Sequence, residues 1–343
     1  MTARWRWAVV ALVCMGALGA TSVVAVLAWQ QHQARAATGT AGELSEGTLT
    51  GDRIVFRSTA AGEGYGHVAA VPLDSPHDAR VVSQLVCDRV DATVTRVACL
   101  RTHRGIVPSY SATVYDAEGD PLAQWPLPGI PSRTRLSPDA SLVASTSFVT
   151  GHSYATTGFS TETVIRTADG KSLGNLEEWT LLVDGAPSAP VDRNYWGVTF
   201  AEDDNTFYAT AALASAGQTM LVRGDIARRT LSALTQGVEC PSLSPDGTRI
   251  AFKRLTTGTA SAVHWTPAIY NLATGDIAIL PEKRSIDDQI AWLDDETLLY
   301  GMPRADVPGD TDVWSLPADG SAPPQLFLEH AWSPSIVREE LTP

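Results

Sequence analysis

A turn-and-strand unit recurs along this chain and constrains its fold more than any other feature. Two copies are nearly intact, at 136–144 and 243–252, and each places a Ser-Pro-Asp turn between two short apolar strands. Weaker copies at 200–209 and 292–300 keep the acidic turn. Repetition at a spacing of about 40–50 residues is typical of solenoids, propellers and repeat arrays.

The residues of the turn explain why the unit forms a hairpin. Pro245 fixes the backbone angle of the first central position, Asp246 suits the second, and Gly247 supplies a left-handed residue that starts the return strand. A second alternating strand with a polar, Gly-ended turn follows each copy, as at 164–170 and 313–320. Two hairpins per unit make a four-stranded sheet, which is one propeller blade.

The count of turns predicts an all-β, six-bladed β-propeller. The first-hairpin turns fall near Asp52, Asp91, Asp139, Asp203, Asp246 and Asp294. The long step before Asp203 contains Ser147–Ser160, which we interpret as an extended loop. An apolar stretch at Trp332–Val337 is left without a hairpin, and we expect it to pair into the first blade and close the ring. The alternative is a β-sandwich whose turns resemble one another by accident.

The N-terminal segment has a different character. Residues 8–29 carry no charge and are long enough to cross a bilayer as a single helix, with Arg4 and Arg6 in front of them. The arginines predict a cytoplasmic N-terminus and a membrane-anchored propeller outside the cytoplasm. The alternative is a signal peptide cleaved near Ala36, which would release a secreted protein.

These observations predict the domain organisation. Its parts are a cytoplasmic stub (1–7), a transmembrane anchor or uncleaved signal (8–29), a flexible linker (30–47), the propeller (48–338) and a tail (339–343).

The charge of the chain excludes some partners. It has 25 basic and 38 acidic residues, for a net charge of −13, and the basic residues do not form a stripe. A protein of this kind is not expected to bind nucleic acid or to adhere to anionic lipid headgroups, so the membrane contact is expected through the N-terminal helix alone.

Two of the four cysteines are predicted to form a disulfide. Cys87 and Cys99 flank the first hairpin of the second blade, at its open end, and an exported location permits oxidation. We expect Cys240 to be free and buried, and Cys14 lies in the predicted span. The cysteines lack metal-ligand spacing, and we predict no metal and no cofactor.

The sequence contains no catalytic motif, so we expect a site where the blades converge. Residues just before the innermost strands meet around the central channel, and several are charged where an apolar strand needs no charge. The candidate ligand-binding residues are Arg89, Arg133, Arg135, Arg193, Asn194, Tyr195, Asp287 and Asp288, with Asp88, Glu239 and Gln289 beside them. The alternative is that they solvate a loop rim and pair with one another.

The repeat resembles that of TolB-type propellers, which are related to WD-like repeats. The segment at 244–252 matches their Ser-Pro-Asp-Gly pattern closely, and 137–139 matches it with Ala140 in place of Gly. The chain is also similar to bacterial membrane-anchored TolB-like translocation proteins, through the hairpin around Cys87 and Cys99 and the segment at 287–295. In TolB an α/β domain precedes the propeller, whereas here we expect an anchor and a linker at that place. The resemblance therefore implies the fold and a binding role, and it does not transfer TolB's partners.

We therefore predict a non-enzymatic binding module at the cell envelope, with a protein or peptide partner. Arginine side chains can clamp a carboxylate, so a peptide C-terminus or an acidic loop is the expected ligand. Two alternatives remain. One is a propeller enzyme, a hydrolase or lyase that uses channel-mouth residues, and the other is the ectodomain of a single-pass sensor.

Overall fold

The computed structural model describes residues 14–16, 19, 21–23, 26, 45–46, 50–149, 160–213, 217–257 and 263–339. The predicted anchor at 8–29 falls mostly outside these residues, as do the linker and most of the loop predicted at 147–160. In the part of the chain that the structure covers, we find no helix long and apolar enough to cross a membrane.

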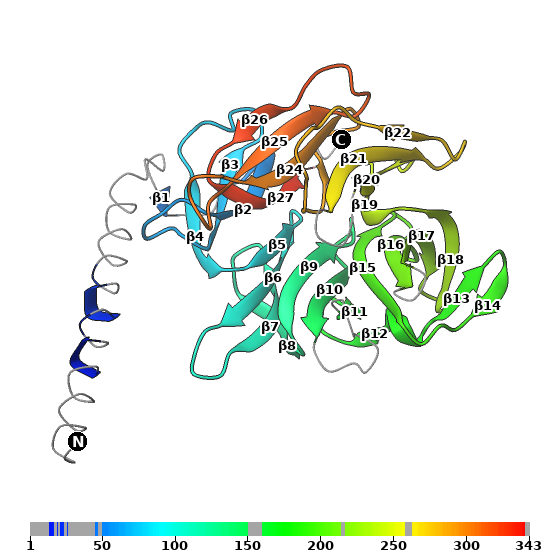
Figure 1. Cartoon of the computed structure of the whole chain (residues 1–343), viewed down its shortest axis with the longest axis horizontal. Helices are drawn as coiled ribbons and strands as arrows, with labels where there is room; N and C mark the ends of the chain where they lie inside the picture. Colours follow the sequence, from blue (N-terminus) through cyan, green and yellow to red (C-terminus); the bar gives the residue numbers. More distant parts are fainter. Residues whose placement is uncertain are drawn as a thin grey trace, which may run out of the picture.

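Six sheets stand around a ring, which confirms the predicted six-bladed propeller (Figure 1). From the innermost strand outward, blade 1 consists of β27 (Ala331–Val337), β2 (Arg53–Ser58), β3 (His67–Pro72), β4 (Val81–Val86) and β1 (Ser45–Glu46). Blade 2 consists of β5 (Arg89–Ala92), β6 (Arg96–His103), β7 (Ser109–Asp116) and β8 (Pro121–Leu127). Blade 3 consists of β9 (Ile130–Leu136), β10 (Leu142–Val149), β11 (Ser160–Thr167) and β12 (Ser172–Asn175).

The remaining three blades complete the ring. Blade 4 consists of β15 (Arg193–Phe200), β16 (Thr206–Leu213), β17 (Gln218–Asp225), β18 (Thr230–Gln236), β13 (Thr180–Val183) and β14 (Ala186–Ser188). Blade 5 consists of β19 (Glu239–Leu243), β20 (Arg249–Thr257), β21 (His264–Asn271) and β22 (Ile277–Ile279). Blade 6 consists of β23 (Ala291–Trp292), β24 (Thr297–Pro303), β25 (Thr311–Pro317) and β26 (Gln325–Leu328).

Blade 4 differs from the predicted four strands. Its extra hairpin, β13–β14, follows the short 3₁₀ helix η1 (Leu176–Glu178), and β13 runs parallel to β18 on the outer edge of the blade. The wide spacing before Asp203 therefore includes an added hairpin as well as the stretch after β10, and the prediction of a loop alone was incomplete.

The Ser-Pro-Asp turns form as predicted. The Ser244 hydroxyl donates to Asp246 at 2.5 Å and accepts from the Arg249 amide at 3.0 Å, while the Gly247 amide donates to the Ser244 carbonyl at 2.9 Å. Gly247 has a φ of +69°, and Ala140 takes the same left-handed conformation in blade 3, with a φ of +61°. Hydrogen bonds made by the serine and aspartate side chains of each turn thus fix the start of the return strand.

The core is divided among the interfaces between neighbouring blades. The largest cluster joins blades 3 and 4, where Trp179 meets Phe207 edge to face with ring centroids 5.6 Å apart. Other clusters join blade 1 to blades 2 and 6, and blade 4 to blade 5. Because each interface depends on both neighbours, the stability of the fold requires the ring to close.

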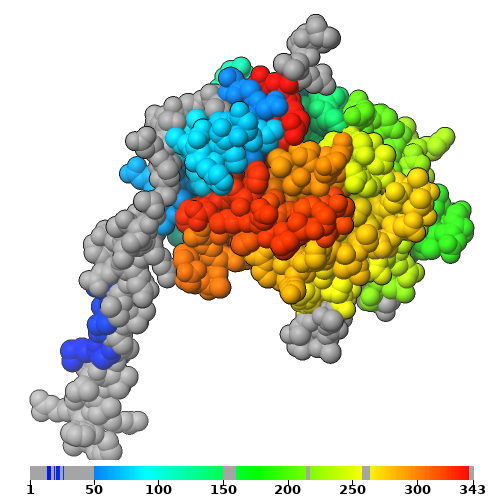
Figure 2. Space-filling model, turned by 90° about the horizontal axis from the view of Figure 1, so that it is seen from above, coloured from blue at the N-terminus to red at the C-terminus, as the bar shows by residue number. Residues whose placement is uncertain are grey.

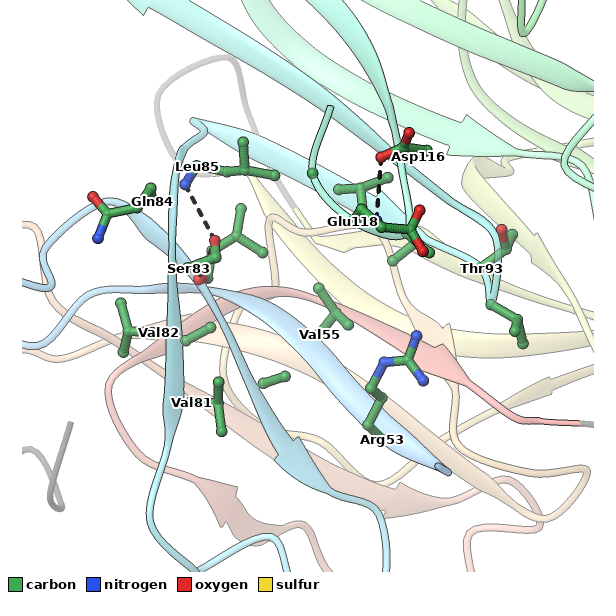
Figure 3. Close-up of a pocket in the computed structure, with 18 residues that line it drawn as sticks. Arg53, Val55, Val81, Val82, Ser83, Gln84, Leu85, Thr93, Asp116 and Glu118 are labelled. Atoms are coloured by element: carbon green, nitrogen blue, oxygen red, sulfur yellow. Dashed lines mark hydrogen bonds between the residues drawn. The ribbon is translucent and has the colours of Figure 1, made fainter. Parts of the chain in front are cut away.

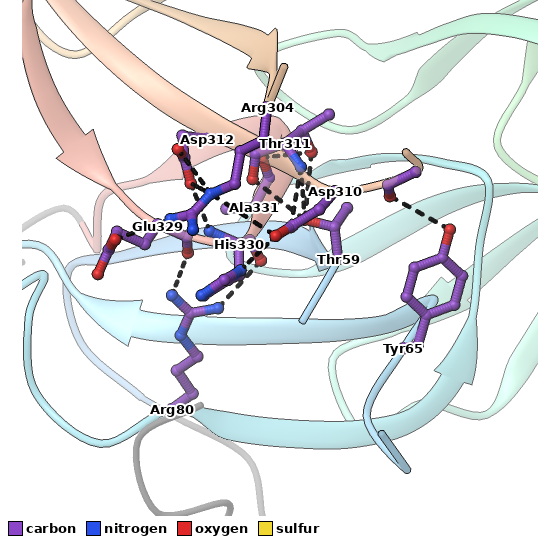
Figure 4. A network of polar contacts seen from close by, with 11 residues as sticks. Thr59, Tyr65, Arg80, Arg304, Asp310, Thr311, Asp312, Glu329, His330 and Ala331 are labelled. Carbon is purple, nitrogen blue, oxygen red and sulfur yellow. Dashed lines mark hydrogen bonds and ion pairs between the residues drawn. The ribbon is translucent and has the colours of Figure 1, made fainter. Parts of the chain in front are cut away.

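The chain closes the ring as predicted, with β27 antiparallel to β2. A buried polar network strengthens the seam between blades 1 and 6 (Figure 4). Asp310 accepts from the Thr59 hydroxyl at 2.8 Å and lies 2.8 Å from His330 Nδ1, and Arg304 bridges Asp312 and Glu329. The space-filling view shows the C-terminal strands packed against the N-terminal blade (Figure 2).

The predicted disulfide is confirmed. Cys87 and Cys99 are bonded, with Cα atoms 5.4 Å apart. Cys87 lies between β4 and β5 and Cys99 lies in β6, so the bond joins the end of blade 1 to blade 2. Cys240 is free and buried, also as predicted.

Candidate functional site

Two arginines meet at the channel mouth, where the innermost strands begin. Arg89 starts β5 and lies 3.6 Å from Asp288, with its guanidinium stacked over the Trp332 ring at 5.0 Å. Arg133, on β9, donates to the Ser132 carbonyl at 2.8 Å and reaches the Asp287 carbonyl at 3.5 Å. Burial, and after it the charge of Arg133, lowers the pKa of Arg89 to about 9. Two positive charges therefore lie close together, and Asp287 and Asp288 offset part of their repulsion.

The two guanidinium groups retain unused hydrogen-bond donors. Among the residues that the structure describes, neither Arg89 Nη1 nor Arg133 Nε has a hydrogen-bond partner, although both atoms are buried. Arg89 Nη1 lies 3.6 Å from Asp288 Oδ1, which is an ion pair but too long for a hydrogen bond. An anion placed between the two arginines would supply the acceptors that both donors lack.

A third cation lies beside them. Lys253, on β20, is 3% exposed, and its ammonium lies 2.6 Å from Asp287 and 4.6 Å from the centre of the Trp265 ring. Burial tends to raise the pKa of Asp287, but the adjacent Lys253 outweighs it and holds that pKa below the usual value. Glu239 lies opposite Lys253 in the register of β19 and β20, and burial raises the pKa of the Glu239 carboxyl.

The structure does not bring every predicted residue to this mouth. Arg135 lies deeper and pairs with Asp91 at 3.3 Å. Arg193 turns toward blade 3 and donates to the carbonyls of Pro190 and Glu177 at 2.7 and 2.5 Å.

Asn194 and Tyr195 are likewise internal to the boundary between blades 3 and 4. Asn194 accepts from the Thr161 amide at 3.0 Å, and Tyr195 is 1% exposed, with its pKa raised to about 12 by burial. The residues that converge are Arg89, Arg133, Asp287 and Asp288.

The channel narrows immediately behind the arginines. A cavity of about 20 Å³ lies among Arg89, Arg133, Asp288 and Gln289, which is room for about one water molecule. In front of it, a depression of about 380 Å³ is lined by Arg57, Tyr65, Arg89, Arg104 and Trp332, among others. The far end, among the Ser-Pro-Asp turns, widens to about 580 Å³. A ligand would therefore sit in the mouth rather than pass through the ring.

Sequence reasoning missed Lys253 and the two tryptophans of the site. Lys253 follows three apolar residues, Ile250, Ala251 and Phe252, and alternates with them toward the buried face of the strand, which was the available signal. Trp332 was assigned to the closing strand without a role at the channel. No group of three or more metal-ligating side chains occurs within the described ranges.

Comparison with known proteins supports the fold and does not identify a family. No protein-family model matches this sequence, and no curated protein matches it. Among solved structures, the chain is similar to the β-propeller domain of the Trilobed protease from Pyrococcus furiosus, with 12% identity, a TM-score of 0.41, and coverage of 68% of this chain and 69% of that one.

Two further solved structures are similar at the same level. A puromycin-hydrolyzing peptidase of Mycobacterium tuberculosis shows 13% identity and a TM-score of 0.48, over 87% of this chain and 45% of the peptidase. Oligogalacturonate lyase from Vibrio parahaemolyticus shows 10% identity and a TM-score of 0.48, over 78% of each chain. The chain thus spans less than half of the peptidase.

These comparisons correct one prediction. The chain was expected not to be an enzyme, yet the propellers it resembles are named as a protease, peptidases and lyases. The prediction of a non-enzymatic protein is therefore wrong as a deduction from the fold, since these enzymes contain similar propellers. At 10–13% identity the likeness assigns no role to any residue of this chain.

Proposed function

We propose that this propeller recognises a carboxylate-bearing ligand at the channel mouth formed by Arg89, Arg133 and Lys253. The observation that carries the proposal is the pair of buried guanidinium groups with unused donors. Both line the cavity of about 20 Å³, and Arg89 also lines the depression of about 380 Å³ in front of it. A carboxylate accepts two parallel hydrogen bonds from a guanidinium, which suits a peptide C-terminus, an acidic loop or an acidic sugar.

The cellular setting belongs to the same proposal. The disulfide is consistent with an oxidising compartment, and the uncharged stretch at 8–29 would anchor the propeller outside the cytoplasm. A protein or peptide partner at the envelope would then present its carboxylate to the mouth of this TolB-like module. Cleavage near Ala36 would instead give a secreted protein with the same site.

Calorimetric titration tests the recognition step. Short peptides with a free C-terminus should bind, and the same peptides with an amidated C-terminus should bind at least about tenfold more weakly, because a charge-assisted pair contributes about 1.5–3 kcal/mol. Arg89→Gln and Arg133→Gln should each remove this preference, whereas Arg228→Gln, at a side chain 81% exposed in the β17–β18 turn, should not. Equal binding of the free and amidated forms would exclude the carboxylate site.

A second candidate function is a hydrolase or lyase that acts at the same mouth. The observation that favours it is the raised pKa of Glu239, which keeps this carboxyl protonated over a wider pH range beside the Lys253 ammonium. A carboxyl of this kind can serve as a general acid or base. Turnover of an ester, peptide or uronate substrate that Glu239→Gln abolishes, with ligand binding retained, would establish it. Turnover unaffected by Glu239→Gln would exclude this role.

A further inference from the structure

A second cavity lies between blades 1 and 2, at the opposite end of β5 from Arg89. It has a volume of about 310 Å³ and is lined by strands β2, β3 and β4 on one side and by the β5–β6 and β7–β8 turns on the other. We call it the interblade crevice. Figure 3 shows Val81, Val82 and Leu85 on one wall and Thr93, Asp116 and Glu118 on the other, with Val55 between them.

The lining of the crevice is mainly aliphatic. Val55 and Val68 are 6% exposed and form the floor, and the half-buried side chains of Val81, Val82 and Leu85 continue it toward the opening. Val94 stands at the rim and is 38% exposed. A concave aliphatic surface of this volume is at the lower end of the range for small-molecule sites, which combine an apolar lining with a few polar groups.

The polar groups lie at the rim and leave an excess of negative charge. Arg53 is already engaged, since it donates to the Gly51 carbonyl at 2.8 Å and to Glu339 at 3.2 Å. One oxygen of Asp116 accepts from the amides of Glu118 and Asp120. The exposed Glu118 carboxylate contacts no cation in the part of the chain that the structure describes. Two carboxylates thus belong to the lining, and its one arginine is already paired with Glu339.

We propose that the interblade crevice is a second binding site, which takes a small amphiphile with an aliphatic body and a cationic amine head. The aliphatic body would displace water from the valine-lined floor, and the amine would lie between Asp116 and Glu118. This site is separate from the channel mouth, whose arginines select the opposite charge, and it does not depend on the proposed function.

Isothermal titration of the full chain with alkylammonium ions tests the proposal, at concentrations below micelle formation. From butylammonium to octylammonium, each added methylene should raise the affinity about fourfold until the cavity is filled. Octylammonium should bind about tenfold more tightly than octanoate, with octanol between them, because the rim charge attracts one head and repels the other.

Two variants separate the two parts of the site. Glu118→Gln should reduce the preference for octylammonium over octanol about threefold and leave the chain-length dependence intact. Val94→Trp should weaken every ligand at least about tenfold, because the indole occupies the space of two or three methylenes. Val107→Trp is the matched control, since Val107 is 82% exposed in the β6–β7 loop and lies outside the crevice.

The proposal is overturned if the affinity does not depend on chain length, or if octanoate binds as well as octylammonium. It is also overturned if Val107→Trp weakens binding as much as Val94→Trp while both variants melt at the wild-type temperature.

Discussion

Asp310→Asn tests whether the polar network at the seam holds the ring closed. Asp310 is 6% exposed, and its two oxygens are shared among the Thr59 hydroxyl, the Thr311 amide, His330 Nδ1 and, at 3.6 Å, Arg304. Asparagine has the same shape and keeps one acceptor oxygen, but it removes the negative charge and places an amide NH₂ donor beside His330 or Arg304. The substitution therefore perturbs the charge of the network and very little of its packing.

The magnitude follows from the remaining contacts. Removal of one partner from a buried ion pair costs about 3–5 kcal/mol when the other charge is left alone. Arg304 is not left alone, because it keeps Asp312 at 2.9 Å and Glu329 at 2.7 Å. We therefore expect a loss of about 2–3 kcal/mol in the free energy of unfolding. At about 2–4 °C per kcal/mol, the melting temperature should fall by roughly 4–12 °C.

Thermal unfolding followed by circular dichroism measures this shift, and hydrogen exchange locates it. The amides of β2 and β27 should exchange faster in Asp310→Asn, since the seam opens more often. Asp306→Asn, an exposed position in the same loop, is the control and should stay within about 0.5 kcal/mol of wild type. Equal melting temperatures for the two variants, with unchanged exchange in β2 and β27, would refute the role assigned to the network.

Three further predictions concern stability. Deletion of residues 331–343 removes β27 and should abolish the cooperative melting transition, because it opens the ring. Cys87→Ser with Cys99→Ser should lower the free energy of unfolding by about 3 kcal/mol at most, measured against wild type in urea, because the loop is short. Glu282 is buried, and burial by itself raises the pKa of its carboxyl. Hydrogen bonds donated by Arg284 and Tyr300 outweigh this effect and hold the pKa below 4.5. Its contribution is complete above that pH, so the stability gap between wild type and Glu282→Gln should shrink as the pH falls below 4.5.

The features that could be predicted from sequence are those with local causes. The Ser-Pro-Asp turn is stabilised by a hydrogen bond between its own side chains, Ser244 and Asp246, so each copy can be recognised in the sequence wherever it occurs. The count of turns then predicted the number of blades, and the unpaired apolar stretch near the C-terminus predicted that the last strand completes the first blade. The β13–β14 hairpin was missed because its pairing with β18 is parallel and joins residues about 50 positions apart, for which no local signal exists.

Only part of the candidate site could be predicted, because the direction of a side chain depends on residues distant in the sequence. Position before an innermost strand is a property of sequence, but side-chain direction and depth are not. Arg133 and Arg135 lie on the same strand, yet Arg135 forms an ion pair with Asp91, while Arg133 has no carboxylate partner of this kind among the described residues. Arg193 is the first residue of β15, and its side chain donates to the Glu177 carbonyl instead. These differences arise from neighbouring blades, which only the assembled ring supplies.

The pairing of the first strand with the last also sets the order in which this chain can fold. Gly51 donates to Glu339, 288 residues away, and although β2 can pair with β3 early, its other edge stays unpaired until β27 is available. During synthesis the middle blades can form in turn, while β2 presents an unpaired edge that another chain could join. Closure of so long a loop is slow, and the stabilising contacts of the seam form only when the last strand pairs. We expect a nascent or truncated chain to need protection from aggregation until its C-terminal residues are available.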